Sequence, residues 1–123
     1  MSEILLSTSL IYQCNFFTQT KDTIAFLKML NHPHVLLQLD LGAVLTNKES
    51  LNEILKAGGD MIGHIHISEP HLAPLTDLNH LEFANQLKQN HGDRYATIEM
   101  SEPKQEPLQK IKQSIEWAKK CYT

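Results

Sequence analysis

The stretch that decides the fold is Met61-Ile62-Gly63-His64-Ile65-His66-Ile67-Ser68-Glu69-Pro70. Its two histidines stand two residues apart, which is the spacing that places side chains on the same face of a β-strand. The isoleucines around them are typical of a strand buried on both faces, as in a parallel sheet covered by helices. Pro70 has no amide hydrogen to donate and ends the strand. The sequence therefore predicts a polar cluster at the carboxyl end of a parallel strand, where α/β folds carry their chemistry.

Strand and helix patterns alternate on both sides of this stretch. Strands are predicted at residues 4–6, where Ser7-Thr8-Ser9 interrupts a longer run, at 35–41 and at 95–100, and a helix pattern follows each strand. A strand followed by a helix, repeated about four times, predicts an α/β fold with a parallel sheet and right-handed crossovers. With 123 residues and no linker, the chain is expected to form a single domain, residues 1–123.

Local signals predict where the helices begin and end. Thr18 or Thr20 is expected to cap the first helix, and Thr46 and Glu49 form a capping box before the second. The pair Gly58-Gly59 is expected to end that second helix in a left-handed conformation. The apolar faces predicted for the last two helices consist of Leu78, Leu81, Ala84 and Leu87, and of Leu108, Ile111, Ile115, Ala118 and Tyr122.

Composition narrows the classes of partner. The net charge is −3, the pI is about 6.1, and no basic stripe is visible, so nucleic acid is not an expected partner. No apolar run approaches the length of a membrane span, and the start of the chain lacks the pattern of a signal peptide. Cys14 and Cys121 are far apart, which suits reduced thiols in a cytosolic protein. We expect a cytoplasmic protein with no membrane or nucleic-acid partner.

Polar residues stand at the carboxyl ends of three successive predicted strands. They are Asp40, His66 and Glu99. Because the carboxyl ends of parallel strands meet at one rim, these side chains are expected to converge. Two carboxylates and an imidazole suit a divalent cation such as Mn²⁺, Mg²⁺, Co²⁺ or Zn²⁺. A glutamate on the same rim could also move a proton at a carbon next to a carbonyl.

Each of these residues also has a purely structural interpretation. An aspartate at a strand end often only caps the loop or helix that follows. A buried histidine such as His64 is more often a core residue with its hydrogen bonds satisfied than a ligand. Glu99, taken alone, could be a surface acid. The occurrence of Asp40, His66 and Glu99 on successive strand ends nevertheless favours the metal site.

Four segments carry a resemblance to a known family. They are Gln38-Leu39-Asp40-Leu41-Gly42, residues 63–70, Thr97-Ile98-Glu99-Met100, and Tyr12-x-x-Asn15-Phe16 with Thr20-Lys21-Asp22. The first three resemble strands six, seven and eight of sugar phosphate isomerases/epimerases, in the xylose isomerase-like TIM-barrel superfamily. The last resembles the segment after the fifth strand. The resemblance implies about four βα units, which make the carboxyl-terminal half of a barrel.

The resemblance also implies roles for individual residues. Asp40, His66 and Glu99 match metal ligands of the family, and Glu99 also matches its catalytic acid/base. His64 and Glu69 are expected to contact the substrate, which would be a small sugar or sugar phosphate. The reaction of the parent family is a divalent-metal-assisted proton transfer at a carbon next to a carbonyl.

The sequence departs from the family pattern in two ways. The glutamate that ends the family's fifth strand is expected near Leu6, where no acid stands, and the family's histidine three residues after the aspartate is Ala43 here. A complete barrel takes about 250 residues, so the matched region is only half of one. We therefore expect weak or absent metal binding and little activity from the chain alone.

These departures keep other interpretations open. The chain could be a non-catalytic half-barrel remnant or an oligomerising scaffold. An AP-endonuclease-like DNA repair protein is less favoured, because it needs more metal ligands and a basic face. An open half-barrel also leaves two parallel strand edges unpaired. Because unpaired edges invite pairing, we expect a homodimer or higher homo-oligomer.

Overall fold

The strands form one parallel sheet in chain order. The structure is a computed structural model that describes residues 4–6, 15–76, 79–90 and 94–123. Within these residues the sheet has four strands in the order β1-β2-β3-β4, and every neighbouring pair is parallel. The predicted α/β fold of half a TIM barrel is confirmed. The strands are β1 (Ile4–Leu6), β2 (Val35–Asp40), β3 (Ile62–Ser68) and β4 (Ala96–Glu99).

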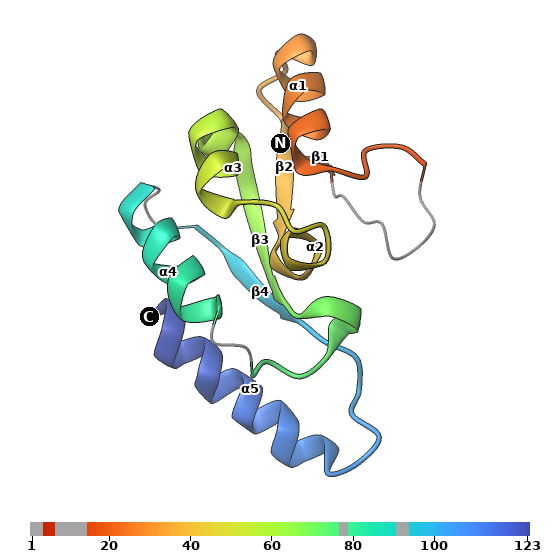
Figure 1. Cartoon of the computed structure of the whole chain (residues 1–123), viewed down its shortest axis with the longest axis vertical. Coiled ribbons are helices and arrows are strands. Elements are labelled where there is room, and N and C mark those ends of the chain that lie inside the picture. Colours follow the sequence, from red (N-terminus) through yellow and green to blue (C-terminus); the bar gives the residue numbers. More distant parts are fainter. Residues whose placement is uncertain (1–3, 7–14, 77–78, 91–93) are drawn as a thin grey trace.

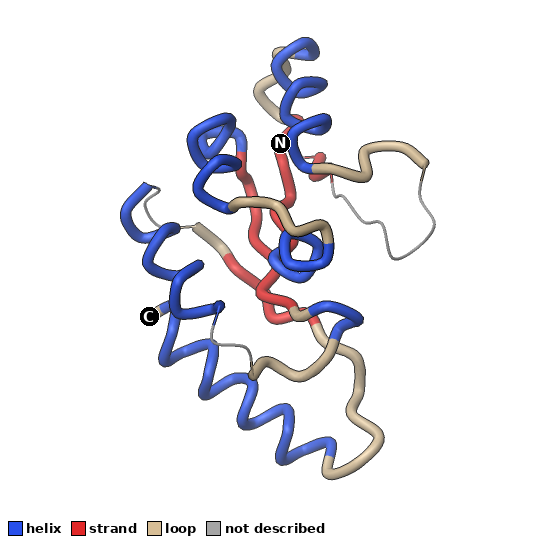
Figure 2. The backbone as a smooth tube through the Cα atoms, in the orientation of Figure 1, coloured by secondary structure: helices blue, strands red, loops and turns tan. Residues whose placement is uncertain are grey.

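Helices cover one face of this sheet. Figure 1 and Figure 2 show the longer helices following one another along the same side of the strands. Each contacts the next, α1 with α3, α3 with α4 and α4 with α5. This arrangement follows from right-handed crossovers between parallel strands taken in order. The helices are α1 (Thr20–Leu30), α2 (Leu41–Thr46), α3 (Leu51–Gly58), α4 (Asn79–Asn90) and α5 (Pro107–Tyr122).

The hydrophobic core lies between the sheet and the helices. Alternate residues of β2, Leu37 and Leu39, are 0% and 1% exposed, whereas the residues between them are only partly buried. Burial on one face alone is the pattern of a sheet whose other face is open. The core consists of the buried strand residues with side chains of the helices, among them Ile24, Leu27, Leu51, Ile54, Leu55, Phe83 and Leu87.

The predicted capping box before the second helix is wrong. Residues after β2 turn at once into the short helix α2, and α3 begins at Leu51 with Ser50 as its N-cap. Glu49 instead accepts hydrogen bonds from the backbone nitrogen and the hydroxyl of Thr20, at 2.8 and 2.9 Å. Neither Thr18 nor Thr20 is the N-cap of α1, because that position is Gln19. A carboxylate from a distant loop therefore satisfies the first turn of α1, a contact that local sequence cannot reveal.

The predicted left-handed end of α3 is also wrong. Gly59 has φ −60°, and none of the described glycines has positive φ. The helix continues into the 3₁₀ turn Gly59–Met61. Gly58 is required for another reason, because a Cβ atom there would lie 2.8 Å from Cγ2 of Ile24. The absence of a side chain lets α3 pack closely against α1.

The apolar faces predicted for the last two helices are only partly right. On α4 the predicted Ala84 and Leu87 are buried, but Leu81 is 40% exposed, and His80 and Phe83 complete the buried face. On α5 the buried residues are Ser114, Ala118 and Cys121, whereas Leu108 is 79% exposed. A polar contact accompanies the burial of Ser114 on α5, since its hydroxyl accepts a hydrogen bond from the backbone nitrogen of Leu75 at 3.0 Å.

Some sequence predictions fall outside the described residues. They concern Ser7-Thr8-Ser9, Tyr12 in the segment that carries the family resemblance, Cys14, and Leu78 in the predicted face of α4. In the part of the chain that is described, no helix combines the length and the apolar character needed to cross a membrane.

We expect Leu37→Ala to lower the free energy of unfolding by about 2–5 kcal/mol, because it removes a fully buried side chain from the centre of the sheet. The same change at the partly exposed Leu81 serves as the control and should cost much less. Urea denaturation followed by circular dichroism measures both. Equal losses for the two variants would show that the core does not lie where the structure places it.

Candidate metal centre

A register shift between β2 and β3 turns both histidines toward the open face of the sheet. Leu37 pairs with Ile62, but Gln38 pairs with His64, so Gly63 is an extra residue between the two pairs. Glycine inside a strand often marks such a bulge. Ile62 is thereby buried with Leu37 under the helices. Without the shift, strict alternation would place His64 beside Leu39, on the covered face.

The shift brings three titratable side chains together at the carboxyl rim. Asp40 pairs with His66, and Ser68 pairs with Glu99, so these side chains leave the sheet on the same face. One candidate ligand atom from each of Asp40, His66 and Glu99 lies within 4.8 Å of the others. His66 Nδ1 is 2.8 Å from Glu99 Oε2 and 3.8 Å from Asp40 Oδ2. The three residues singled out by the sequence are therefore neighbours in space.

Asp40 is both a helix cap and a member of this cluster. Its Oδ1 accepts hydrogen bonds from the backbone nitrogen of Ala43 at 2.7 Å and from the hydroxyl of Ser68 at 2.9 Å. The first bond makes Asp40 the N-cap of α2. Its other oxygen, Oδ2, faces His66. The structural and the metal-binding interpretations of this residue are thus compatible, because each uses a different oxygen.

The donor set fits a divalent cation. Two carboxylates and an imidazole nitrogen converge, and their side chains are 16%, 42% and 21% exposed for Asp40, Glu99 and His66. A second neighbour of His66 Nδ1 is the side-chain nitrogen of Gln38, at 3.1 Å. Mixed oxygen and imidazole ligands of this kind suit Mn²⁺, Mg²⁺, Co²⁺ or Zn²⁺. Partial exposure leaves room for a small molecule to reach the site from the open face.

His64 lies on the open face one layer below the cluster, toward the amino ends of the strands. Its Nε2 is 2.9 Å from the hydroxyl of Thr97, and its ring centre is 5.4 Å from that of His66. Gln38, His64 and Thr97 make this layer polar. The central part of the open face, on β2, β3 and β4, is therefore mainly polar.

Glu69 points away from the cluster, toward the helices. It is 6% exposed, and its Oε1 accepts a hydrogen bond from the backbone nitrogen of Thr76 at 3.0 Å. The same oxygen is 3.3 Å from Nε2 of the fully buried His80. His80 Nδ1 is hydrogen-bonded to the Tyr122 hydroxyl at 2.6 Å. This chain of contacts joins the carboxyl end of β3 to α4 and α5.

The chemistry of Tyr122 suits this buried position. Burial raises the pKa of its phenol above the ordinary value, and the nearby Cys121 and Glu69 raise it further. The hydroxyl therefore stays protonated and can donate to His80. Sequence reasoning did not single out His80, although it shares a helical face with Phe83, Ala84 and Leu87 at the spacing of a buried stripe.

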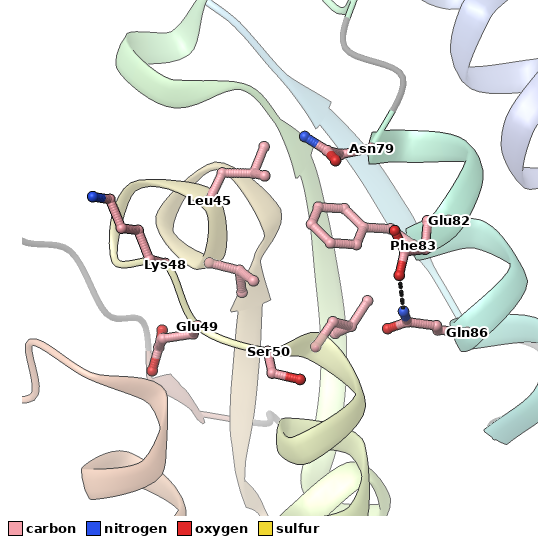
Figure 3. A pocket seen from close by; sticks show the side chains of 10 residues that line it. Leu45, Lys48, Glu49, Ser50, Asn79, Glu82, Phe83 and Gln86 are labelled. Atoms are coloured by element: carbon pink, nitrogen blue, oxygen red, sulfur yellow. Dashed lines mark hydrogen bonds between the residues drawn. The ribbon is translucent and has the colours of Figure 1, made fainter.

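Two hollows on the helical side of the described residues do not resemble a catalytic site. One, of about 280 Å³, lies between α4 and the segment that joins α2 to α3 (Figure 3). Two of its lining residues, Glu82 and Gln86, bind each other, and a third, Glu49, caps α1. A second hollow, of about 430 Å³, lies between α1 and α3. Within the described residues, the only candidate group of metal ligands is the cluster on the open face.

The family's fifth-strand acid has no counterpart in the described part of β1. The family resemblance places this acid near Leu6, and Leu6 stands in register with Leu37. Leu37 belongs to the face covered by helices, not to the face of Asp40. A fourth carboxylate is therefore not supplied by residues 4–6.

Comparison with known families identifies the chain. Residues 8–121 match the family described as xylose isomerase-like TIM barrel. The chain belongs to this family. Its four strands match half of a TIM barrel, and Asp40, His66 and Glu99 lie together at the carboxyl ends of β2, β3 and β4. Comparison with curated protein sequences gave no match.

Solved structures of sugar epimerases share the fold. A 3-keto-D-glucoside 4-epimerase from E. coli superposes with a TM-score of 0.84 at 21% identity, over 97% of this chain and 46% of the epimerase. A D-psicose 3-epimerase from Clostridium cellulolyticum H10 with D-tagatose gives 0.79 at 11% identity, over 96% and 48%. A D-allulose 3-epimerase from Methylomonas sp. with D-allulose gives 0.74 at 23%, over 89% and 44%. The chain thus spans about half the length of these enzymes.

We expect Glu69→Gln to destabilise the fold by about 1–3 kcal/mol, because it weakens the buried hydrogen bonds that the carboxylate accepts from Thr76 and makes with His80. Glu99→Gln is the matched control and should cost little, because Glu99 lies on the open face. Chemical denaturation at neutral pH compares the two variants. A stable Glu69→Gln variant would argue against a supporting role for the contacts with His80 and Thr76.

Proposed function

We propose that this chain is a sugar isomerase/epimerase-like protein that binds a divalent metal through Asp40, His66 and Glu99. The observation that supports this most strongly is their convergence at the carboxyl rim of a xylose isomerase-like sheet. The proposed reaction is proton transfer at a carbon next to the carbonyl of a small sugar or sugar phosphate. The epimerase structures with D-tagatose and D-allulose support a sugar as the substrate class.

Glu99 is the residue proposed to carry the proton. Its side chain is 42% exposed, which makes it the most accessible of the three residues. Its Oε2 lies 2.8 Å from His66 Nδ1, so the carboxylate borders the proposed metal position. When bound, the cation would polarise the carbonyl oxygen of the sugar and so acidify the adjacent carbon. Glu99 would then remove or return the proton at that carbon.

The other residues have supporting roles in this proposal. Asp40 and His66 hold the metal. His64 remains a candidate for contact with the substrate, because it lies on the open face. Glu69 is buried beneath the rim, so in this proposal its effect on substrate binding is indirect. It positions the segment that it holds at Thr76. A cytoplasmic location and a single domain over residues 1–123 stay predictions from the sequence.

We expect the purified chain to bind Mn²⁺ weakly, since three candidate ligands make a site with few carboxylates. Asp40→Asn and His66→Ala should each abolish detectable binding in isothermal titration calorimetry. His64→Ala, on the same face but outside the cluster, should leave affinity unchanged. If the wild-type chain binds no Mn²⁺, Mg²⁺, Co²⁺ or Zn²⁺, the metal assignment is wrong.

Turnover of ketohexoses or their phosphates should be far slower than the 1–1000 s⁻¹ range typical of enzymes.

A specific observation also favours assembly into a larger barrel. The two outer strands, β1 and β4, each have only one neighbour in the described sheet. Apolar side chains lie exposed near both of these ends, Ile4 at 58% on β1 and Tyr95 at 87% just before β4. Two copies related by a two-fold axis could pair β1 of one with β4 of the other and close an eight-stranded barrel. We propose a homodimer, or a higher homo-oligomer, of this kind.

We expect sedimentation equilibrium to give a mass of about twice 14.0 kDa at micromolar concentration. Ile4→Lys should shift the protein toward the monomer, because it places a charge on the free edge of β1. Leu81→Lys, a similar change on the exposed side of α4, should leave the mass unchanged. A stable wild-type species of 14.0 kDa with a cooperative melt would contradict the proposal.

The alternative function is a non-catalytic half-barrel that serves as an oligomerising scaffold. It is favoured by the lack of a fourth carboxylate in the described part of β1. The two proposals separate cleanly, because a scaffold would assemble without binding metal, whereas the enzyme-like protein requires the cluster of Asp40, His66 and Glu99.

A further inference from the structure

We propose that Ser68 determines which cation the site accepts. By holding one oxygen of Asp40, it makes that carboxylate a single-oxygen ligand and so favours small octahedral cations such as Mn²⁺ and Mg²⁺ over Ca²⁺. This inference rests on the metal site proposed above. Ser68 does not itself belong to the candidate ligand group, and its role is to position Asp40.

Hydrogen bonding defines the direction of the Ser68 hydroxyl. Ser68 is 0% exposed, and its Oγ accepts a hydrogen bond from the backbone nitrogen of Gly42 at 2.9 Å. Its own hydrogen is therefore free to donate, and the nearest acceptor is Asp40 Oδ1 at 2.9 Å. The other acceptor within reach, the carbonyl of His66, is farther away at 3.5 Å.

A second donor holds the same oxygen of Asp40. The backbone nitrogen of Ala43 donates to Oδ1 at 2.7 Å. Two of the acceptor sites on Oδ1 are thus occupied, whereas Oδ2 faces His66 across 3.8 Å. For both oxygens to bind one cation, Oδ1 would have to give up at least one of these bonds. That loss would leave the buried Ser68 hydroxyl with only the distant carbonyl of His66, or the N–H of Ala43 without its capping partner, which is unfavourable.

The surrounding backbone keeps Ser68 in this position. A Cβ atom on Gly42 would lie 2.7 Å from the carbonyl oxygen of Glu69 and 3.0 Å from Ser68 Oγ. Glycine at residue 42 therefore lets the first turn of α2 approach the end of β3. The close approach brings the N–H of Gly42 to Ser68, and the local cap of α2 brings the N–H of Ala43 to Asp40, so the arrangement exists before any cation binds.

A carboxylate restricted to one oxygen discriminates between cations by size. Ca²⁺ takes six to eight oxygen ligands and often binds carboxylates through both oxygens, whereas Mg²⁺ requires a compact octahedron. If Asp40 can offer only Oδ2, the site supplies too few oxygens for Ca²⁺ but suits a six-coordinate ion that keeps several waters. Releasing Oδ1 should relax this discrimination.

The test compares Mn²⁺ and Ca²⁺ affinities of the wild-type chain and of Ser68→Ala by isothermal titration calorimetry. We expect Ser68→Ala to lose about 10–100-fold in Mn²⁺ affinity, as is usual when a group that orients a ligand is removed. Ca²⁺ affinity should fall less or rise, so that the ratio of Mn²⁺ affinity to Ca²⁺ affinity is lower than in the wild-type chain. Thr97→Val is the matched control, because it removes a hydroxyl on the same face that contacts His64 instead of Asp40.

A thermal melt of each variant shows whether it is folded. If Ser68→Ala does not fold, Ser68→Cys replaces it, because the thiol has a similar size and donates only weakly. The inference is supported if Ser68→Ala lowers the ratio of Mn²⁺ affinity to Ca²⁺ affinity and Thr97→Val leaves both affinities unchanged. Equal losses for both cations would overturn it and leave the metal site intact. Absence of binding by the wild-type chain would overturn the metal site and this inference together.

Discussion

The pairing of β2 with β3 is the constraint on which the candidate site depends. The extra residue Gly63 shifts the register, so that Asp40 stands beside His66 while Ile62 remains buried beside Leu37. Because side chains alternate along a strand, a slip of one residue would turn His66 into the hydrophobic core and separate it from both carboxylates. A single backbone irregularity therefore satisfies two demands, an unbroken core on one face and a polar cluster on the other.

The same network that assembles the cluster also ties the rim to the helices. Ser68 connects Asp40 to the first turn of α2, and Glu69, the next residue, connects the strand end to His80 on α4. His80 in turn reaches Tyr122 near the end of α5. Ser68 and Glu69 are consecutive, and their side chains point to opposite sides of the strand end. Together they join the site to α2, α4 and α5. Buried polar chains of this kind fix geometry because each unmatched group would be costly.

The open face explains how a half-barrel can hold such a site. Gln38, His64 and Thr97 form a polar layer beneath the cluster, so the centre of this face does not expose a large apolar surface to water. Exposed apolar side chains do occur at the two outer strands, at Ile4 on β1 and at Tyr95 just before β4. Closure of a barrel would therefore be driven by edge pairing and by contacts at the ends of the sheet, more than by burial of the inner face.

The sequence by itself determined the alternation of the strands with the longer helices, the parallel sheet and the identity of the clustered residues, but not the short helix α2. Alternation and strand length are local properties, and the spacing of His64 and His66 already required them to share a face. Which face that is depends on the bulge at Gly63, and only the pairing with β2 reveals it. Distant partners were likewise invisible in the sequence, as with Glu49, which caps α1 from a loop 29 residues away. Glu69 shows the same limit, because its role depends on His80 and Thr76 reaching it through the packing of the helices. Local sequence specifies backbone preference and periodicity, whereas hydrogen bonds between separate elements are decided when those elements pack together.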